Sequence, residues 1–114
     1  MMRAYGSLRR AADFQRVYRR GERAGSKHLA VYALASSRGG ESRPEVGFSI
    51  GKGVGSAVVR NRLRRRCRTI LDAAPLGSCL GRRVVIVARA GAGELSFESL
   101  RAELGAGLHR LGLA

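Results

Sequence analysis

The segment from Val46 to Arg68, VGFSIGKGVGSAVVRNRLRRRCR, predicts a strand, a glycine-rich turn and a helix in direct succession. From Glu45 to Ile50, bulky apolar residues alternate with Gly and Ser, which is typical of a strand with one packed face and one face without bulk. Ser56 can cap a helix that we expect to run to about Asp72. The segment therefore joins a half-buried strand to a long helix through a short connection.

That connection, GKGVGS at positions 51–56, is rich in glycine and precedes a helix N-terminus. Such a turn can cradle a phosphate. It does not match a Walker A loop, which ends in Lys-Ser or Lys-Thr, and it does not match the pattern G-x-G-x-x-G. A tight strand-to-helix turn is the better interpretation.

The predicted helix is apolar on one side and strongly basic on the other. Val59, Leu63, Cys67 and Ile70 form its apolar stripe. Six arginines occupy nine consecutive positions from 60 to 68, with Asn61 among them. A basic face is usually just solvated, but this one repels itself unless a polyanion neutralises it, and each guanidinium can hold phosphate oxygens bidentately. The pattern therefore favours nucleic-acid binding over a solvated face.

The remaining elements follow from similar signals. Ser7 can cap a first helix that runs to about Arg20, and a last helix is expected from 95 to 111. The apolar runs 29–35 and 83–88 are strand candidates, and 29–35 is expected to form a hairpin with 45–50. The order helix-strand-strand-helix-strand-helix predicts one α+β domain over residues 1–114, built as a small two-layer α/β sandwich.

Three of the six aromatic residues belong to the first helix and the strand that follows it. If the helix packs beside that strand, Phe14, Tyr18 and Tyr32 line one groove. Aromatic faces stack on unpaired bases at about 1–3 kcal/mol per base. The alternative is a place in the core. It stays open for Phe14, whereas the hydroxyls of Tyr18 and Tyr32 favour a wet position.

The chain has 114 residues and a formal net charge of +14, with far more Arg than Lys. Residues 1–23 and 56–72 each carry +5, so these two segments hold ten of the fourteen net charges. Such a charge indicates a polyanionic partner, nucleic acid before an anionic membrane surface. There is no run of eighteen apolar residues, no secretory h-region and no cysteine framework. We therefore expect a cytoplasmic protein.

A catalytic site formed by the chain itself is hard to find. His28 and His109 have no paired nucleophile, the eight carboxylates are scattered, and Cys67 falls on the apolar stripe. We expect no catalytic residue and no metal ligand on the chain, and hence a binding protein. A basic RNA chaperone or ribosomal protein and a protein-only nuclease are the alternatives.

Two stretches give the chain a family resemblance. VGFSIGKGVGSAVVRNRLRR at 46–65 has a V-G-hydrophobic-S strand, a Lys-containing turn and an A-V-x-R-N-R helix, and LRRAADFQRVYRRG at 8–21 looks like a matching first helix. In these features the chain strongly resembles the bacterial ribonuclease P protein component family. The resemblance covers about residues 6–111.

The resemblance implies a function as well as a fold. It implies a left-handed β-α-β crossover through the helix that carries Arg60-Asn61-Arg62, called the RNR helix below. It also implies the protein subunit of ribonuclease P, which removes the 5′ leader of precursor tRNA and carries its chemistry in the RNA subunit with Mg²⁺. The implied partners are that catalytic RNA and the precursor leader, with no membrane and no obligate protein partner.

Individual residues match the family's binding positions. By position, the RNA-binding residues are Lys52, Arg60, Asn61, Arg62, Arg64, Arg65 and Arg68, and the leader cleft is lined by Phe14, Tyr18 and Tyr32. Two positions depart from the usual pattern. Gly53 stands where a second Lys is frequent, and Arg66 stands where an apolar residue is usual. Arg66 either widens the basic ridge or snorkels from the core.

Overall fold

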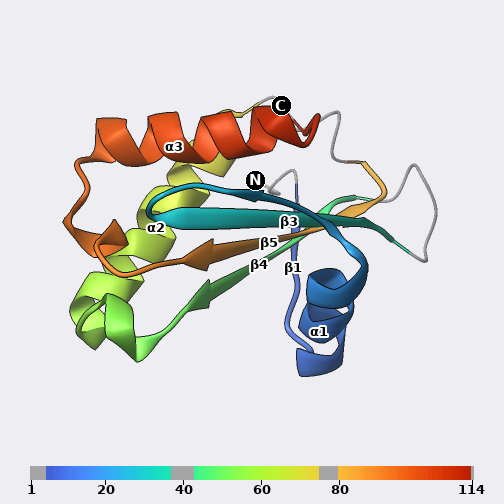
Figure 1. Ribbon diagram of the computed structural model, residues 1–114, viewed down its shortest axis with the longest axis horizontal. Coiled ribbons are helices and arrows are strands. Elements are labelled where there is room, and N and C mark those ends of the chain that lie inside the picture. Colours follow the sequence, from blue (N-terminus) through green and yellow to red (C-terminus); the bar gives the residue numbers. More distant parts are fainter. Residues whose placement is uncertain (1–4, 37–42, 75–79, 114) are drawn as a thin grey trace.

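The computed structural model describes residues 5–36, 43–74 and 80–113. A five-stranded mixed sheet in the order β1-β4-β5-β3-β2 forms its centre (Figure 1). The strands are β1 (Gly6–Ser7), β2 (Glu22–Gly25), β3 (Leu29–Ala35), β4 (Glu45–Ile50) and β5 (Arg82–Ala88). The helices are α1 (Ala11–Arg20), α2 (Ala57–Ala73) and α3 (Phe97–Arg110), and the 3₁₀ turns η1 (Lys52–Val54) and η3 (Ala92–Glu94) precede α2 and α3.

Strand β5 occupies the middle of the sheet. It pairs antiparallel with β3 and parallel with β4, so β3 and β4 do not pair with each other. The predicted β3–β4 hairpin is therefore wrong. The reason is that the run Val84–Val87 is apolar on both faces, and such a run is best buried between two neighbours. Because β4 and β5 are parallel, the chain crosses between them through α2.

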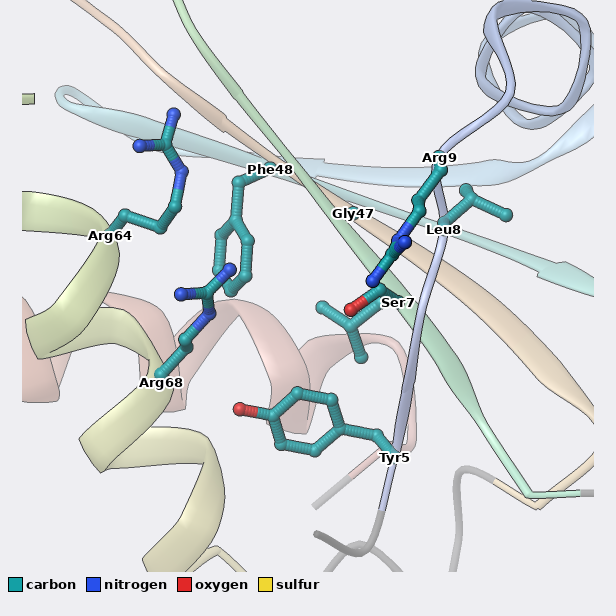
Figure 2. Close-up of a pocket in the computed structure, with 9 residues that line it drawn as sticks. Tyr5, Ser7, Leu8, Arg9, Gly47, Phe48, Arg64 and Arg68 are labelled. Carbon is teal, nitrogen blue, oxygen red and sulfur yellow. The ribbon is translucent and has the colours of Figure 1, made fainter. Parts of the chain in front are cut away.

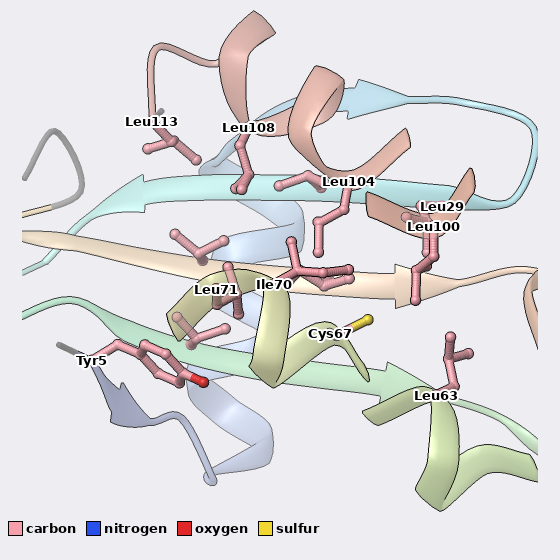
Figure 3. Packing of buried hydrophobic residues seen from close by; sticks show 14 of the residues in the cluster. Tyr5, Leu29, Leu63, Cys67, Ile70, Leu71, Leu100, Leu104, Leu108 and Leu113 are labelled. Carbon is pink, nitrogen blue, oxygen red and sulfur yellow. The ribbon is translucent and has the colours of Figure 1, made fainter. Parts of the chain in front are cut away.

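The two faces of the sheet are covered unequally. Helices α2 and α3 pack on one face and enclose the main core, with buried residues such as Leu63, Leu71, Ile86, Leu100 and Leu104 (Figure 3). Helix α1 lies on the opposite face over a smaller cluster of Leu8, Val17 and Val85. The expected sandwich is thus the sheet with α2 and α3, and α1 is an addition on the other side.

The helix ends test the capping predictions. Ser56 caps α2 by accepting a hydrogen bond from the Val59 amide at 3.3 Å, and α2 ends one residue beyond the predicted end. The predicted Ser7 cap is wrong, because Ser7 belongs to β1 and pairs with Val46. Helix α1 begins at Ala11 without a side-chain cap. The last helix begins two residues later than predicted, at Phe97 after the cap Ser96.

Strands β1 and β2 escaped the sequence analysis because neither shows an apolar alternation. β1 has two residues, and of the four in β2 only Ala24 is buried. The turn signals Pro75 and Gly77, the second cysteine Cys79 and most of the loop after β3 lie outside the described residues. No helix in the described ranges is long and apolar enough to cross a membrane.

Candidate nucleic-acid interface

Helix α2 presents most of the predicted RNA-binding residues along one accessible side. Asn61, Arg62 and Arg65 are exposed, whereas Arg64 and Arg68 are half-buried. Arg64 Nη1 donates to Asn61 Oδ1 at 2.9 Å, which leaves the amide nitrogen of Asn61 turned to other partners. The described acids form no printed ion pair with these arginines, so their charge is available to an external polyanion.

Three arginines of α2 have contacts that the helical wheel did not foresee. Arg62 Nη2 donates to the Gly93 carbonyl at 3.3 Å, and Arg66 Nη1 donates to the Leu95 carbonyl at 3.2 Å. Both bonds tie α2 to the η3 segment. Arg66 therefore snorkels from the core edge rather than widening the exposed ridge. Arg60 is half-buried, and its Nε is buried without a hydrogen-bond partner among the described residues.

The turn before α2 is compact and leaves its lysine in solvent. Lys52 and Gly53 are both exposed in η1, and a side chain at Gly53 would meet open space. Gly55 has φ of +156°, in the region that favours glycine. A Cβ there would also lie 2.9 Å from the Val59 side chain. This is the tight strand-to-helix turn that the sequence predicted.

The three predicted cleft aromatics lie together between α1 and the sheet. The Tyr18 ring meets Phe14 at 6.4 Å and Tyr32 at 5.1 Å between centroids, both edge to face. All three are partly buried and pack against the small cluster under α1. A Cβ at Gly47 would lie 2.4 Å from Phe14 Cζ, so glycine on β4 allows the helix this close approach. The rings are thus neither fully core nor fully free, and a face of the cluster stays accessible.

A hollow of about 200 Å³ lies beside this cluster at the edge of β4 (Figure 2). Arg64 and Arg68 enter it from α2, and Tyr5 and Arg9 enter it from the chain before α1. The Arg68 guanidinium lies 5.6 Å from the centre of the Phe48 ring. The hollow joins the α2 arginines to the aromatic cluster, because Leu8 and Gly47 border both.

Sequence reasoning missed Tyr5, Arg9 and Phe48 as members of this surface. Phe48 was placed on the packed face of its strand, and it does pack against the main core. The first two residues could have been found only from the pairing of β1 with β4, which brings them beside α2. Two residues of strand carry no readable periodicity, so the sequence held no such signal.

The comparisons with known proteins agree with this geometry. A family model described as Ribonuclease P matches residues 2–112. The ribonuclease P protein component of Acidothermus cellulolyticus is 42% identical over 91% of this chain and 86% of its own length, and that of Streptomyces bikiniensis is 40% identical over 97% and 95%. The chain belongs to the ribonuclease P protein component family.

Solved structures of ribonuclease P proteins share the fold. The protein of Staphylococcus aureus superposes with a TM-score of 0.83 at 23% identity, covering 94% of this chain and 95% of that one. The protein of Thermotoga maritima gives 0.74 at 22% identity, with 97% and 96% covered. At these identities the likeness concerns the fold: the β4-α2-β5 crossover and the sheet are features of ribonuclease P proteins.

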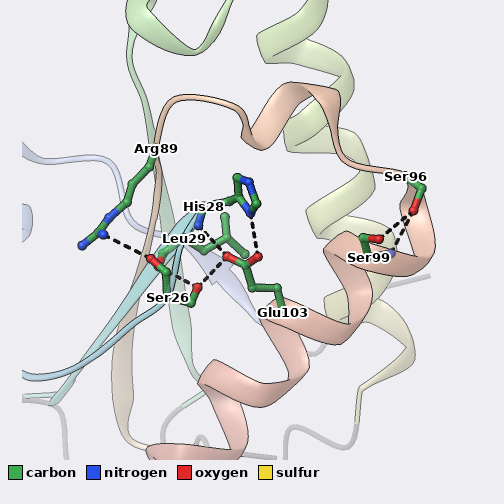
Figure 4. A network of polar contacts seen from close by, with 7 residues as sticks. All are labelled: Ser26, His28, Leu29, Arg89, Ser96, Ser99 and Glu103. Atoms are coloured by element: carbon green, nitrogen blue, oxygen red, sulfur yellow. Dashed lines mark hydrogen bonds and ion pairs between the residues drawn. The ribbon is translucent and has the colours of Figure 1, made fainter.

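The candidate catalytic groups of this ribonuclease P protein have structural roles. Burial raises the pKa of the Cys67 thiol to about 12, so the thiolate required of a nucleophile is disfavoured. His28 Nδ1 lies 2.9 Å from Glu103 Oε1, and Glu103 also accepts from the His28 amide and from Ser26 (Figure 4). Burial opposes the charge of Glu103, but these hydrogen bonds hold its pKa below the ordinary value. The network fastens α3 to the β2–β3 turn.

Metal-ligating side chains do not converge in the described parts of the chain. No three His, Cys, Asp or Glu residues there form a group that could hold a metal ion. The acids that lie closest to the interface, Asp13 and Glu45, are both taken by Arg83, which pairs with each at 3.3 Å. A single buried guanidinium thus joins α1, β4 and β5.

Proposed function

We propose that this chain is the protein subunit of a ribonuclease P ribonucleoprotein. It binds the catalytic RNA and the 5′ leader of precursor tRNA, and so promotes endonucleolytic removal of the leader in the cytoplasm. The observation that carries the proposal is the joint placement of two surfaces: an arginine-rich helix and, next to it, a partly open aromatic cluster.

Helix α2 is the surface proposed for the catalytic RNA. Lys52, Arg60, Asn61, Arg62, Arg64, Arg65 and Arg68 are the residues assigned to this contact. Guanidinium groups suit phosphate because each can donate two parallel hydrogen bonds, and Asn61 can serve a ribose or a base edge. Arg62 and Arg66 also fix the helix to η3, so the basic ridge stays in one orientation.

The aromatic cluster is the surface proposed for the leader. Single-stranded RNA exposes base faces, and Phe14, Tyr18 and Tyr32 offer rings on which unpaired bases can stack. Edge-to-face packing keeps the three rings at fixed angles, so little side-chain freedom is lost when a base docks. Mature tRNA has no leader and gains nothing from this surface.

The hydrolytic step is assigned to the RNA subunit. Mg²⁺ on that RNA would supply the activated water, and no step is routed through a metal on this chain. The role of the protein is to position the substrate and to neutralise phosphate charge, which lets two polyanions assemble at physiological salt. This role requires no catalytic side chain from the protein.

Substitution of Tyr32 by Ala tests the leader contact. In the holoenzyme reconstituted with its cognate RNA, the affinity for precursor tRNA is expected to fall by roughly five- to one-hundred-fold, as for the loss of a stacking interaction of about 1–3 kcal/mol. The affinity for mature tRNA should not change. Equilibrium binding of both RNAs under non-cleaving conditions measures the difference.

Tyr32→Phe is the matched control. It keeps the ring but removes the hydroxyl that accepts a hydrogen bond from Arg23 Nε at 3.2 Å. Near-normal precursor affinity in this variant would point to stacking as the cause. Equal losses for precursor and mature tRNA in Tyr32→Ala would refute leader binding here, and cleavage by protein and Mg²⁺ without the RNA subunit would refute the assigned role.

A further inference from the structure

Helix α1 has an outer side that the proposed function leaves unused. Its inner side packs Val17 and the cluster aromatics against the sheet. On the outer side a shallow hollow of about 340 Å³ is lined by Ala12, Gln15, Arg16, Arg19 and Arg20. The small side chain of Ala12 leaves room between long basic ones, so the outer side offers a concave cationic surface.

The charge of this outer side is uncompensated. Arg16, Arg19 and Arg20 are exposed, and none of them has a side-chain hydrogen bond or ion pair within the described residues. The one acid of α1, Asp13, is turned toward the sheet and pairs with Arg83. The inward turn of Asp13 leaves only basic and neutral side chains around the hollow.

The position of α1 separates this surface from the RNR helix. α1 contacts β3 and β5 on one face of the sheet, whereas α2 and α3 cover the other face (Figure 1). A stretch of RNA lying along α2 therefore cannot also lie in the hollow of α1. The partner must be a separate segment of polyanion.

We propose that the outer side of α1 binds the phosphate backbone of precursor tRNA, next to the leader bases held by the aromatic cluster. The inference rests on the proposed function, because it takes the inner side of the same helix as the leader site. A helix with its side chains is about 10–12 Å across, so a strand that leaves the cluster has to pass only one helix to reach Arg16, Arg19 and Arg20. Guanidinium groups in a concave surface suit phosphate oxygens.

The triple variant Arg16→Gln/Arg19→Gln/Arg20→Gln tests this surface. Glutamine keeps the helix propensity and removes three charges. In the reconstituted holoenzyme, the slope of log affinity for precursor tRNA against log salt concentration should become shallower by about two, from about 0.7 per lost phosphate contact on single-stranded RNA. The affinity of the protein for the RNA subunit alone should be unchanged.

Arg89→Gln/Arg101→Gln/Arg110→Gln is the charge-matched control, because these exposed arginines lie in or near α3 on the other face of the sheet. Circular dichroism melting establishes that both triple variants fold. An equal change of slope in the two variants would overturn the proposal, since it would reflect net charge alone. A loss confined to RNA-subunit affinity would overturn it too, by assigning the surface to the other RNA.

The Tyr32→Ala result separates this inference from the proposed function. A leader-specific loss in Tyr32→Ala with a normal slope in the α1 triple variant would refute only the outer surface. No leader-specific loss in Tyr32→Ala would refute the leader site, whatever the triple variant shows.

Discussion

Arg60 shows how one residue can serve binding at the expense of stability. Its Nε is buried without a hydrogen-bond partner in the described part of the chain, and an unsatisfied buried donor costs about 1–3 kcal/mol. Such a cost persists in a folded protein when the group has another use. The position of Arg60 at the start of the basic ridge of α2 is consistent with that use.

We predict that Arg60→Met leaves the free protein as stable as before or stabilises it by up to about 1 kcal/mol. Methionine keeps the aliphatic stem that packs at the helix edge and removes the orphaned donor. The same variant should bind the RNA subunit more weakly. Urea unfolding of the free protein and filter binding of the RNA measure the two effects.

Arg65→Met is the control for this prediction, because Arg65 is exposed and carries no buried donor. Its effect on stability should stay within about 0.5 kcal/mol. A destabilisation above 1 kcal/mol by Arg60→Met would contradict the interpretation, since Arg60 would then be a packing residue.

The elements differ in how well the sequence predicted them. Helix α2 has a Ser cap, a clear apolar stripe and 17 residues, and its bounds were predicted to within about one residue. The start of α1 was wrong, because the local signal at Ser7 competes with a nonlocal one: the Gly6 amide donates to the Pro44 carbonyl at 2.7 Å. Pairing between distant segments cannot be read from local propensity.

The sheet order failed for a related reason. β3 and β4 are consecutive along the chain and both apolar, so a hairpin between them is the simplest arrangement. Parallel pairing of β4 with β5 depends on the packing of α2 across the sheet, which involves residues such as Cys67 and Ile70 far from either strand. The site residues on α2 were predicted from composition and spacing, whereas Tyr5 and Arg9 required the three-dimensional pairing.

At the scale of elements, the tether between α1 and the sheet makes a prediction. Arg83 has a side chain only 10% exposed and bridges Asp13 of α1 to Glu45 of β4. Arg83→Met should lower the free energy of unfolding by about 1–3 kcal/mol, because two partly buried carboxylates lose their partner. Hydrogen exchange should accelerate for α1 amides more than for α2 amides.

A double-mutant cycle with Asp13→Asn sharpens this test. If the pair acts directly, the double variant should be less destabilised than the sum of the single variants, by about 0.5 kcal/mol or more. Additive effects, or an exchange rate that rises equally in α1 and α2, would show that Arg83 supports the sheet without tethering the helix.

At the scale of the whole molecule, the charge divides between two sides. Six arginines lie on α2, and α1 carries Arg16, Arg19 and Arg20 on the opposite face of the sheet. The sequence predicted these two concentrations of charge but not that the sheet separates them. A protein basic on both faces can hold two RNA segments apart at a fixed distance, as the assembly of a catalytic RNA with its substrate requires.

This charge should also govern the stability of the free protein. The formal net charge is +14 within principal dimensions of 37 × 27 × 27 Å. At about 0.01 M salt the Debye length is about 30 Å, so charges repel across the whole molecule, whereas at about 0.15 M it is about 8 Å. We predict that the melting temperature rises by several degrees between these two concentrations of NaCl, while RNA affinity falls over the same range. The Arg16→Gln/Arg19→Gln/Arg20→Gln variant should show a smaller rise, because it carries less charge to screen. Thermal denaturation followed by circular dichroism measures both, and a flat or falling melting temperature would mean that the basic faces are too far apart to destabilise the fold.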